Sequence, residues 1–267
     1  MTLFENIIYW LHFGPFRRIF RFLARRGLAG CHRILLGPAR GCVFAGADLP
    51  YALGIYEIHV QRALTRVLNS GSVFYDVGAN VGFFTLLGAK LAGDAGSVIA
   101  FEPSSDNCRA LRALCDSNGV HNVELVSEAV SAADGDAFFA ADSNHAQCHL
   151  AADQEAGSVK VRTVTLDTFT KTHIVPRVVL MDIEGAEYEA LRGARELLSR
   201  QDAPAWIIEV HNVDTDKQVA EMLTKSGYRL TTLLPPVARA GRYPIHLLAE
   251  KSPARITEPL LTLAAGK

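Results

Sequence analysis

The stretch Asp76-Val77-Gly78-Ala79-Asn80-Val81-Gly82 decides the fold of this chain. It follows the β-rich run Val73–Tyr75 and precedes an apolar helical pattern, so we expect it to join a strand to a helix. Gly78 and Gly82 remove side chains where the chain turns, and Asn80 is the residue type that best replaces glycine in a left-handed conformation. A ligand can therefore approach the backbone of this loop closely.

The acidic residues near this loop favour a cationic, phosphate-free nucleoside as its ligand. The pattern is D-x-G-x-N-x-G, and it lacks the G-x-G-x-x-G triplet with which dinucleotide folds hold a pyrophosphate on a helix N-terminus. The next strand ends in Phe101-Glu102-Pro103, about 20 residues further on, where a carboxylate can accept hydrogen bonds from both ribose hydroxyls. NAD-binding folds share this second acid, so an NAD-type oxidoreductase remains an alternative.

Strand and helix patterns alternate on both sides of the loop. This alternation predicts an α/β fold with a mainly parallel sheet, helices on both faces, and ligands at the carboxyl ends of the strands. The stretch 137–164 breaks the rhythm and predicts an inserted hairpin with a long loop, while the last two strands lack a helix between them and should pair antiparallel. We expect strands at 73–77, 97–101, 122–126, 178–181, 205–210, 228–233 and 244–249, and helices at 56–68, 82–91, 104–117, 186–198 and 215–225.

The charge of the chain is unevenly distributed. Its 267 residues carry a net charge of −1, which gives no general attraction to nucleic acid. Residues 1–40, however, hold seven arginines against the single acid Glu5, a charge of about +6. Two short amphipathic helices are expected at 4–11 and 16–23. These helices either pack onto the domain with their arginines in solvent or make peripheral contact with an anionic membrane.

Five motifs are spread along the chain: Tyr56-Glu57, the segment 74–84, Phe101-Glu102-Pro103, Thr165-Leu166-Asp167 and Asp182-Ile183-Glu184-Gly185-Ala186-Glu187. Together they resemble the FkbM-type S-adenosylmethionine-dependent methyltransferases, over residues 53–234. The resemblance implies a class I methyltransferase (Rossmann-like) fold, with a seven-stranded sheet whose last strand is inserted antiparallel. It also implies methyl transfer from S-adenosyl-L-methionine to a hydroxyl oxygen of a sugar, glycolipid or secondary-metabolite acceptor.

Carried over by position, the resemblance assigns the residues that bind the methyl donor. The glycine loop would line S-adenosyl-L-methionine, the acid after the second core strand would hold the ribose, and the pair after the third core strand would flank the adenine. The family commonly has lysine two positions before the Asp of Asp-x-Glu-Gly, whereas this chain has Leu180. The expected donor set is Asp76, Gly78, Ala79, Asn80, Gly82, Phe83, Glu102, Pro103, Glu128, Ala129 and Asp182.

The chain is expected to have three parts. They are a basic, amphipathic helical segment at 1–50, the methyltransferase domain at 51–250 and a C-terminal tail at 251–267.

The N-terminal apolar runs are shorter than the roughly 20 residues that cross a bilayer. Five cysteines without a C-x-x-C pair are typical of a reducing compartment. We expect a cytoplasmic protein, free or peripheral to the inner face of a membrane, and the sequence leaves its oligomeric state open.

Three polar residues after the central strands are candidates for the chemistry. Methyl transfer from a sulfonium is an in-line displacement, and a base that takes the proton of a hydroxyl acceptor speeds it by roughly 10²–10⁴-fold. His211 follows the strand 205–210, and its ordinary pKa near 6.5 suits a base. Asp182 and Glu184 follow the neighbouring strand and either orient the acceptor or act as the base. No metal ligand set is predicted, although these residues with Glu209 leave a divalent cation open.

Structural roles without a part in the chemistry remain open for several of these residues. His211 suits an ordinary turn residue, and Glu184 suits a helix N-terminus, where it favours the dipole. At least two of the rings near the loop are expected in the core rather than beside the sulfonium: Tyr75, Phe83 and Phe84. Three function classes remain: the methyltransferase with a small-molecule or glycan acceptor and no nucleic-acid partner, the NAD-type oxidoreductase, and a noncatalytic scaffold that binds the donor, which only Leu180 supports.

Overall fold

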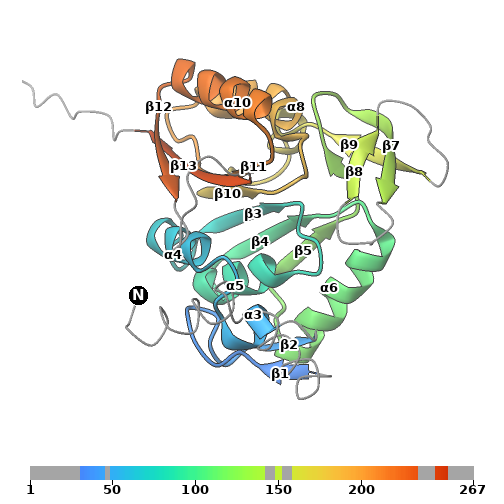
Figure 1. Ribbon diagram of the computed structural model, residues 1–267, viewed down its shortest axis with the longest axis vertical. Coiled ribbons are helices and arrows are strands. Elements are labelled where there is room, and N and C mark those ends of the chain that lie inside the picture. Colours follow the sequence, from blue (N-terminus) through green and yellow to red (C-terminus); the bar gives the residue numbers. More distant parts are fainter. Residues whose placement is uncertain (1–30, 46–48, 142–147, 152–157, 234–243, 252–267) are drawn as a thin grey trace, which may run out of the picture.

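A seven-stranded sheet forms the centre of the protein (Figure 1). The computed structural model describes residues 31–45, 49–141, 148–151, 158–233 and 244–251. The strand order is β12-β13-β11-β10-β3-β4-β5, and among these seven β13 alone runs opposite to the other six. This confirms the expected α/β fold and the antiparallel final pair. The strands are β3 (Val73–Val77), β4 (Ser97–Phe101), β5 (Val123–Val126), β10 (Val178–Met181), β11 (Ala205–Val210), β12 (Tyr228–Leu233) and β13 (Ile245–Lys251).

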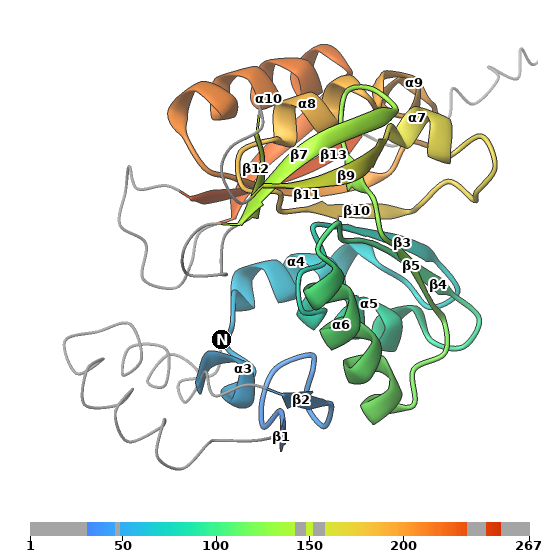
Figure 2. The same ribbon diagram turned by 90° about the vertical axis from the view of Figure 1, so that its right-hand side faces the viewer.

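Helices cover both faces of the sheet. In both ribbon views α4, α5 and α6 lie on one side, and α8 and α10 lie on the other (Figures 1 and 2), where Figure 2 also shows α9. Their bounds are α4 (Ile58–Val67), α5 (Phe83–Ala92), α6 (Ser105–Asn118), α8 (Glu187–Arg192), α9 (Arg195–Ser199) and α10 (Val213–Lys225). The short helices α3 (Leu49–Leu53) and α7 (Leu166–Phe169) were not expected from the sequence.

The two faces of β3 show why this strand lies at the centre. Its β-branched and aromatic residues favour an extended chain, and successive side chains point to opposite faces. Phe74 packs in the layer of α4 and α5, whereas Tyr75 packs in the layer of α8 and α10. Both are 0% exposed, and each such burial stabilises the fold by about 1.5–3 kcal/mol. Leu180 of β10 lies in the same layer as Phe74.

A second, four-stranded sheet follows β5 and replaces the simple hairpin that the sequence predicted. Its order is β6-β9-β7-β8, with β7 antiparallel to both β8 and β9. The expected hairpin is therefore present, but part of its expected long loop is the strand β8. The bounds are β6 (Ala129–Val130), β7 (Gly135–Ala141), β8 (Cys148–Ala151) and β9 (Val159–Val164).

The single helix expected at 186–198 is two helices, α8 and α9, and this corrects the sequence prediction. The break falls at Gly193, where a Cβ would lie 2.1 Å from the backbone oxygen of Ser131. The chain therefore passes so close to the segment after β6 that the helix cannot continue there with an ordinary side chain.

The N-terminal part also differs from its prediction. The helices expected at 4–11 and 16–23 lie outside the described residues. Within the expected helical segment 1–50, the described part holds an antiparallel pair of strands, β1 (Cys31–Arg33) and β2 (Val43–Ala45). Phe44 packs into the layer of α4 and α5, so this part belongs to the packed domain. No helix among the described residues is both long and apolar enough to span a membrane.

Candidate active site at the carboxyl edge of the sheet

The glycine loop turns sharply between β3 and α5. Gly78, Asn80 and Gly82 have φ values of 86°, 50° and 94°, so the left-handed conformation expected for Asn80 is confirmed. At Gly78 a Cβ would lie 1.9 Å from the backbone oxygen of Asp182. Only glycine fits this contact, and the loop is therefore held directly against the end of β10.

Glu102 ties the loop to the end of β4. Its Oε2 accepts a hydrogen bond from the backbone N–H of Asn80, and its Oε1 accepts one from that of Ser104, each at 2.8 Å. The residue is 4% exposed. Burial raises its pKa, although the two N–H donors act in the opposite direction. Glu102, next to Pro103, thus lies where the sequence predicted a ribose acceptor, and its two oxygens are oriented by the backbone.

Asp76 lies beneath the loop. It is 1% exposed, and its Oδ2 accepts a hydrogen bond from the hydroxyl of Thr85 at 2.5 Å. Its Oδ1 is buried and has no hydrogen-bond partner among the described residues. Burial raises the pKa of Asp76 to about 7. The sequence placed this carboxylate along the donor, and contact with the donor stays a prediction.

The aromatic rings beside the loop belong to the core. Phe83 is 4% exposed, and its ring lies edge-on to those of Tyr51 and Tyr56, with centroids 5.3 Å away in each case. Tyr75 is 0% exposed. The expectation that at least two of the three rings are core residues is confirmed. Contact between Phe83 and the donor stays a prediction.

The pair expected at the adenine follows β5 on the same edge. The backbone N–H of Glu102 donates to the oxygen of Val126, the last residue of β5, at 3.0 Å. Glu128 is half-buried, and its Oε1 lies 4.0 Å from Nε of Arg162. Ala129 is 6% exposed and begins β6. The structure therefore places both residues near Glu102, and their contact with adenine stays a prediction.

The three candidate catalytic residues come together beyond β10 and β11. Nε2 of His211 lies 3.1 Å from Oε2 of Glu184 and 3.6 Å from Oδ1 of Asp182. The sequence analysis missed a fourth member, Glu187, whose Oε1 accepts from Nδ1–H of His211 at 3.0 Å and from the N–H of Gly185 at 2.9 Å. Glu187 is 0% exposed. We call Asp182, Glu184, Glu187 and His211 the His211 cluster.

The electrostatics of this cluster disfavour His211 as the base, and its part in the chemistry stays a prediction. Burial alone would lower its pKa, but hydrogen bonds to Glu184 and Glu187 and the charge of Asp182 outweigh burial and raise it to about 11. The ring is therefore protonated at neutral pH and acts here as a hydrogen-bond donor rather than as a base. Burial and the nearby carboxylates of Glu209 and Glu57 raise the pKa of Asp182 well above its ordinary value.

A second acid–histidine group adjoins the first. Nε2 of His246 lies 3.3 Å from Oε2 of Glu57 and 3.4 Å from Oε2 of Glu209. Nδ1 of His246 lies 3.0 Å from Nε2 of His59. Burial and His246 lower the pKa of His59 to about 3, so this ring is neutral. We call Glu57, Glu209 and His246 the His246 cluster.

The sequence analysis missed most of this second group. Glu57 was visible only as part of the Tyr56-Glu57 motif, and Glu209 only as a neighbour of His211. His246 lies near the start of the final strand, and the antiparallel register of β11 and β13 places it opposite Glu209. The apolar run around His246, 244–249, was the one sequence signal that could have placed His246 on a buried strand.

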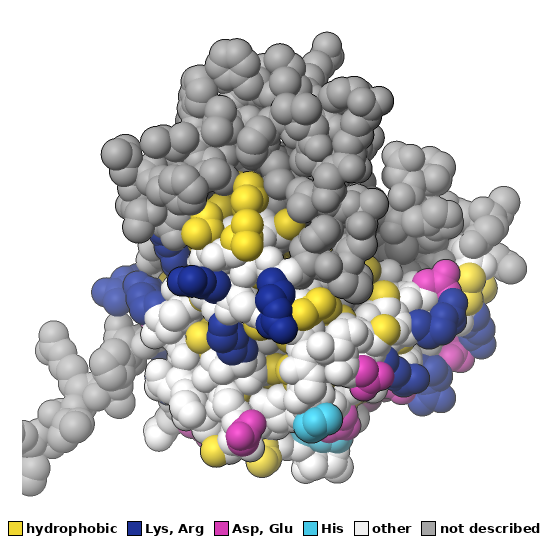
Figure 3. All heavy atoms as spheres, turned by 90° about the horizontal axis from the view of Figure 1, so that it is seen from below, with side chains coloured by type: hydrophobic (Ala, Val, Ile, Leu, Met, Phe, Trp, Pro, Cys, Tyr) yellow, Lys and Arg dark blue, Asp and Glu magenta, His cyan; other side chains and the backbone are white. Residues whose placement is uncertain are grey.

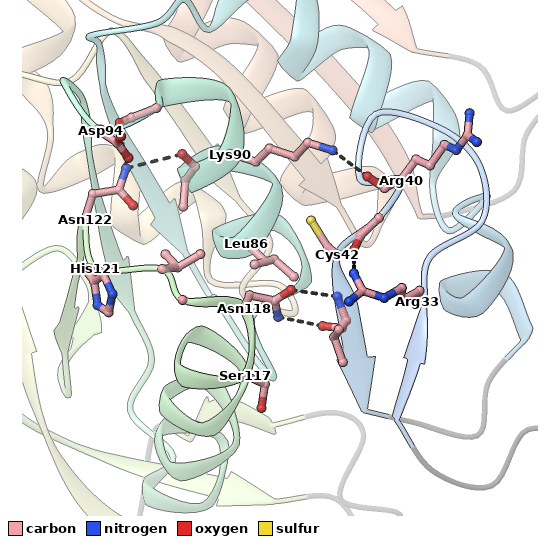
Figure 4. Close-up of a pocket in the computed structure, with 16 residues that line it drawn as sticks. Arg33, Arg40, Cys42, Leu86, Lys90, Asp94, Ser117, Asn118, His121 and Asn122 are labelled. Carbon is pink, nitrogen blue, oxygen red and sulfur yellow. Dashed lines mark hydrogen bonds between the residues drawn. The ribbon is translucent and has the colours of Figure 1, made fainter.

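A separate hollow lies at the opposite edge of the sheet. It measures about 1020 Å³ and lies between the β1–β2 pair and the C-terminal ends of α5 and α6 (Figure 4). Figure 3 shows Lys and Arg side chains gathered on this lower face. Nζ of Lys90 donates to the oxygen of Arg40 at 2.7 Å, and the Asn118 side chain bonds both N–H and oxygen of Val43. These groups fasten β1–β2 to the domain, and none of the expected site residues line the hollow.

Comparisons with known proteins show that the sequence is similar to methyltransferases. The family described as the methyltransferase FkbM domain matches residues 76–230. A hexuronic acid methyltransferase, AglP of Haloferax volcanii, is 28% identical over 177 residues, which are 64% of this chain and 69% of that protein.

Two solved structures show a similar course of the chain. The methyltransferase FkbM of Methylobacillus flagellatus has a TM-score of 0.49 at 16% identity, over 88% of this chain and 60% of that one. Fibrillarin of Aeropyrum pernix, solved with S-adenosyl-L-methionine, has a TM-score of 0.46 at 8% identity, over 72% of this chain and 73% of that one.

Proposed function

The chain belongs to the FkbM methyltransferase family, and on this premise we propose that it transfers the methyl group of S-adenosyl-L-methionine to an oxygen of a sugar-containing acceptor. Family membership sets aside the NAD-type oxidoreductase. The noncatalytic scaffold loses its support from position 180, because Leu180 is 4% exposed within the core and does not line the carboxyl edge.

The observation that carries the proposal is the charge around the glycine loop. Glu102 and Asp76 accept hydrogen bonds from backbone N–H groups and a hydroxyl, and no described Lys, Arg or His forms an ion pair with either. The protein therefore places no cationic side chain in an ion pair with these two carboxyl groups, and the negative charge that they retain at neutral pH, partial at Asp76, is left for a ligand. This charge suits a cationic sulfonium nucleoside and opposes a pyrophosphate.

The His211 cluster lies beside the donor loop. Its side chains are the ones proposed to bind the acceptor. Asp182 is the link, because its backbone oxygen contacts Gly78 and its buried Oδ1 has no hydrogen-bond partner among the described residues. We assign Asp182 the removal of the acceptor proton, with Glu184 and His211 orienting the hydroxyl. Glu187 acts through His211, whose Nδ1–H it holds, and is a positioning residue.

The reaction then balances as a single displacement. An acceptor oxygen attacks the methyl carbon in line with the sulfonium, the new C–O bond forms as the C–S bond breaks, and sulfur keeps the electron pair. The acceptor proton passes to Asp182, and S-adenosylhomocysteine leaves. No electron acceptor or reductant is needed.

The name of the relative AglP, a hexuronic acid methyltransferase, supports a sugar-containing acceptor. A hexuronic acid offers both hydroxyl and carboxylate oxygens. We propose a hydroxyl of such a sugar as the acceptor of this chain, since a base beside the donor is needed for a hydroxyl and is dispensable for a carboxylate.

Labelled S-adenosyl-L-methionine tests the proposal against glycans with and without hexuronic acid. We expect label in a sugar as an ether that survives mild alkali, and loss of transfer in Asp182→Asn. Label released by alkali would show an ester on the carboxylate and overturn the hydroxyl assignment. No incorporation together with no binding of S-adenosyl-L-methionine by calorimetry would overturn the donor assignment.

On sequence charge alone, we also propose that residues 1–40 contact anionic membrane surfaces, which would make the protein peripheral to a membrane. Sedimentation with vesicles of anionic lipid tests this, with vesicles of neutral lipid as the control. We expect binding to the anionic vesicles to be lost when five arginines are changed to glutamine; unchanged binding would contradict the proposal. The five are Arg17, Arg18, Arg21, Arg25 and Arg26.

A further inference from the structure

The His246 cluster has no part in the proposed methyl transfer, yet it gathers ligating atoms from three distant parts of the chain. Glu57 precedes α4, Glu209 lies on β11, and His246 lies on β13. One atom from each lies within 4.8 Å of the other two. Two carboxylates and one imidazole are thus held together at the side of the candidate active site.

The distances within the cluster match the edges of a coordination polyhedron. A small divalent cation lies about 2.0–2.2 Å from nitrogen and oxygen ligands, which puts neighbouring ligand atoms roughly 3.0–3.5 Å apart. Nε2 of His246 lies 3.3 Å from Oε2 of Glu57 and 3.4 Å from Oε2 of Glu209. The three side chains therefore need little movement to share one ion.

A buried atom without a hydrogen-bond partner points into this space. His246 is 8% exposed, and its Nε2 has no hydrogen-bond partner among the described residues, although both carboxylates are near. Burying a polar nitrogen without a hydrogen bond is costly. The two glutamate charges also exceed what one imidazolium can neutralise, whereas a divalent cation balances both.

The surroundings of His246 fit a metal ligand. Metal-binding histidines usually donate their second ring N–H to an acceptor that fixes the tautomer. Nε2 of His59 lies 3.0 Å from Nδ1 of His246 and can accept that N–H, which leaves Nε2 of His246 with a lone pair for the ion. The His211 cluster fits less well, because both nitrogens of His211 lie near carboxylate oxygens, Nε2 at 3.1 Å from Glu184 and Nδ1 at 3.0 Å from Glu187.

We propose that Glu57, Glu209 and His246 bind one divalent first-row transition metal ion. One imidazole and two carboxylates form a ligand set suited to Zn²⁺ or Mn²⁺ rather than to Ca²⁺, which prefers oxygen ligands alone. The ion lies beside the acceptor side of the site, because Oε1 of Glu209 lies 4.0 Å from Nε2 of His211. The proposal concerns metal binding and holds whether or not the proposed acceptor is correct.

Calorimetric titration of chelator-treated, full-length protein with Zn²⁺, and Mn²⁺ titration followed by paramagnetic resonance, test the site. We expect one equivalent to bind. His246→Gln and Glu57→Gln each remove a ligand, and each should weaken binding by more than the roughly 10–100-fold expected for His59→Phe, which removes only the orienting acceptor. Glu57→Gln keeps the test valid if His246→Gln does not fold.

Two control variants separate this site from its surroundings. His173→Gln removes another histidine near a carboxylate, 3.8 Å from Glu124, and Glu184→Gln changes the adjoining His211 cluster. Both should bind the metal within about threefold of the unchanged protein, because they leave all three ligands in place. The proposal is overturned if no stoichiometric binding occurs, or if Glu184→Gln abolishes binding while His246→Gln retains it.

Discussion

At the β3–β4 half of the carboxyl edge, Glu102 and Asp76 are hydrogen-bonded by backbone N–H groups and a hydroxyl. At the β10–β11 half, Glu184 and Glu187 face the imidazole ring of His211. Neutral donors hold a carboxylate in place without removing its charge. Imidazole rings compensate the charge and bring protons that can move. The first half is therefore suited to a bound cation, and the second to an acceptor that must lose a proton.

The two halves meet at one contact, the close approach of Gly78 to the backbone oxygen of Asp182. The donor loop and the end of β10 are therefore placed by the same contact. A methyl group and an acceptor oxygen have to lie within about 3–3.5 Å for displacement. We infer that this backbone contact sets the relative position of donor and acceptor.

The largest expected effect comes from Gly78→Ala, which forces the two halves apart. A Cβ would lie 1.9 Å from backbone, at a φ of 86°. We expect a loss of about 4 kcal/mol in the free energy of unfolding, from overpacking and backbone strain together, and loss of donor binding. Urea unfolding and calorimetry measure both.

Gly71→Ala is the matched control, because Gly71 has a φ of 79° and no atom within 4 Å of an added Cβ. It should cost only about 1 kcal/mol, the backbone strain alone. Equal losses in the two variants would show that the contact with Asp182 has no special role.

A smaller effect tests the burial of charge in the donor half. The pKa of Asp76 is about 7 in the folded protein, above its ordinary value of 3.8, so the folded state holds an extra proton between these pH values. Stability should therefore fall as pH rises from 4 to 7. In Asp76→Asn this part of the pH dependence disappears, and the difference in the free energy of unfolding between the two proteins should change by about 3 kcal/mol over that range. If urea unfolding showed the same difference in stability between the two proteins from pH 4 to pH 7, it would contradict a buried Asp76 with a raised pKa.

The smallest effect is expected far from both halves. Arg66 and Glu250 form an ion pair at 2.6 Å, with side chains 59% and 35% exposed. Exposed pairs contribute about 0–1 kcal/mol, so Arg66→Ala should change the free energy of unfolding by less than that and leave donor binding as it is. A loss above 2 kcal/mol would mean that charges outside the carboxyl edge are as important as those within it.

Local sequence patterns predicted the donor half better than the acceptor half. The glycine loop, Asn80 and Glu102 lie within one strand–loop–helix–strand unit, so their spacing and residue types determine how they meet. On the other side, Glu57 and His246 come from opposite ends of the domain; the register of β11 and β13 sets His246 opposite Glu209, and the start of α4 brings Glu57 to within 3.3 Å of His246. Such a meeting depends on how the sheet closes, which short-range periodicity does not contain.

The ordinary pKa assumed for His211 does not hold in the fold, for a related reason. Its ordinary pKa near 6.5 applies to a solvated ring, whereas three carboxylates from one segment, Asp182, Glu184 and Glu187, surround it in the fold. The sequence showed these acids as one motif, but it did not show that their side chains lie around the ring of His211. The β1–β2 pair was missed because its strands have three residues each, too few for an alternating pattern.

The affinity for S-adenosylhomocysteine of two glutamate variants tests most directly whether the halves have separate roles. Glu102→Gln should bind this product about tenfold more weakly, because it replaces a carboxylate held by two N–H donors. Glu184→Gln changes only the acceptor half and should stay within about threefold of the unchanged protein. Equal losses of affinity in both variants, measured by calorimetry, would contradict the division of the carboxyl edge into a donor half and an acceptor half.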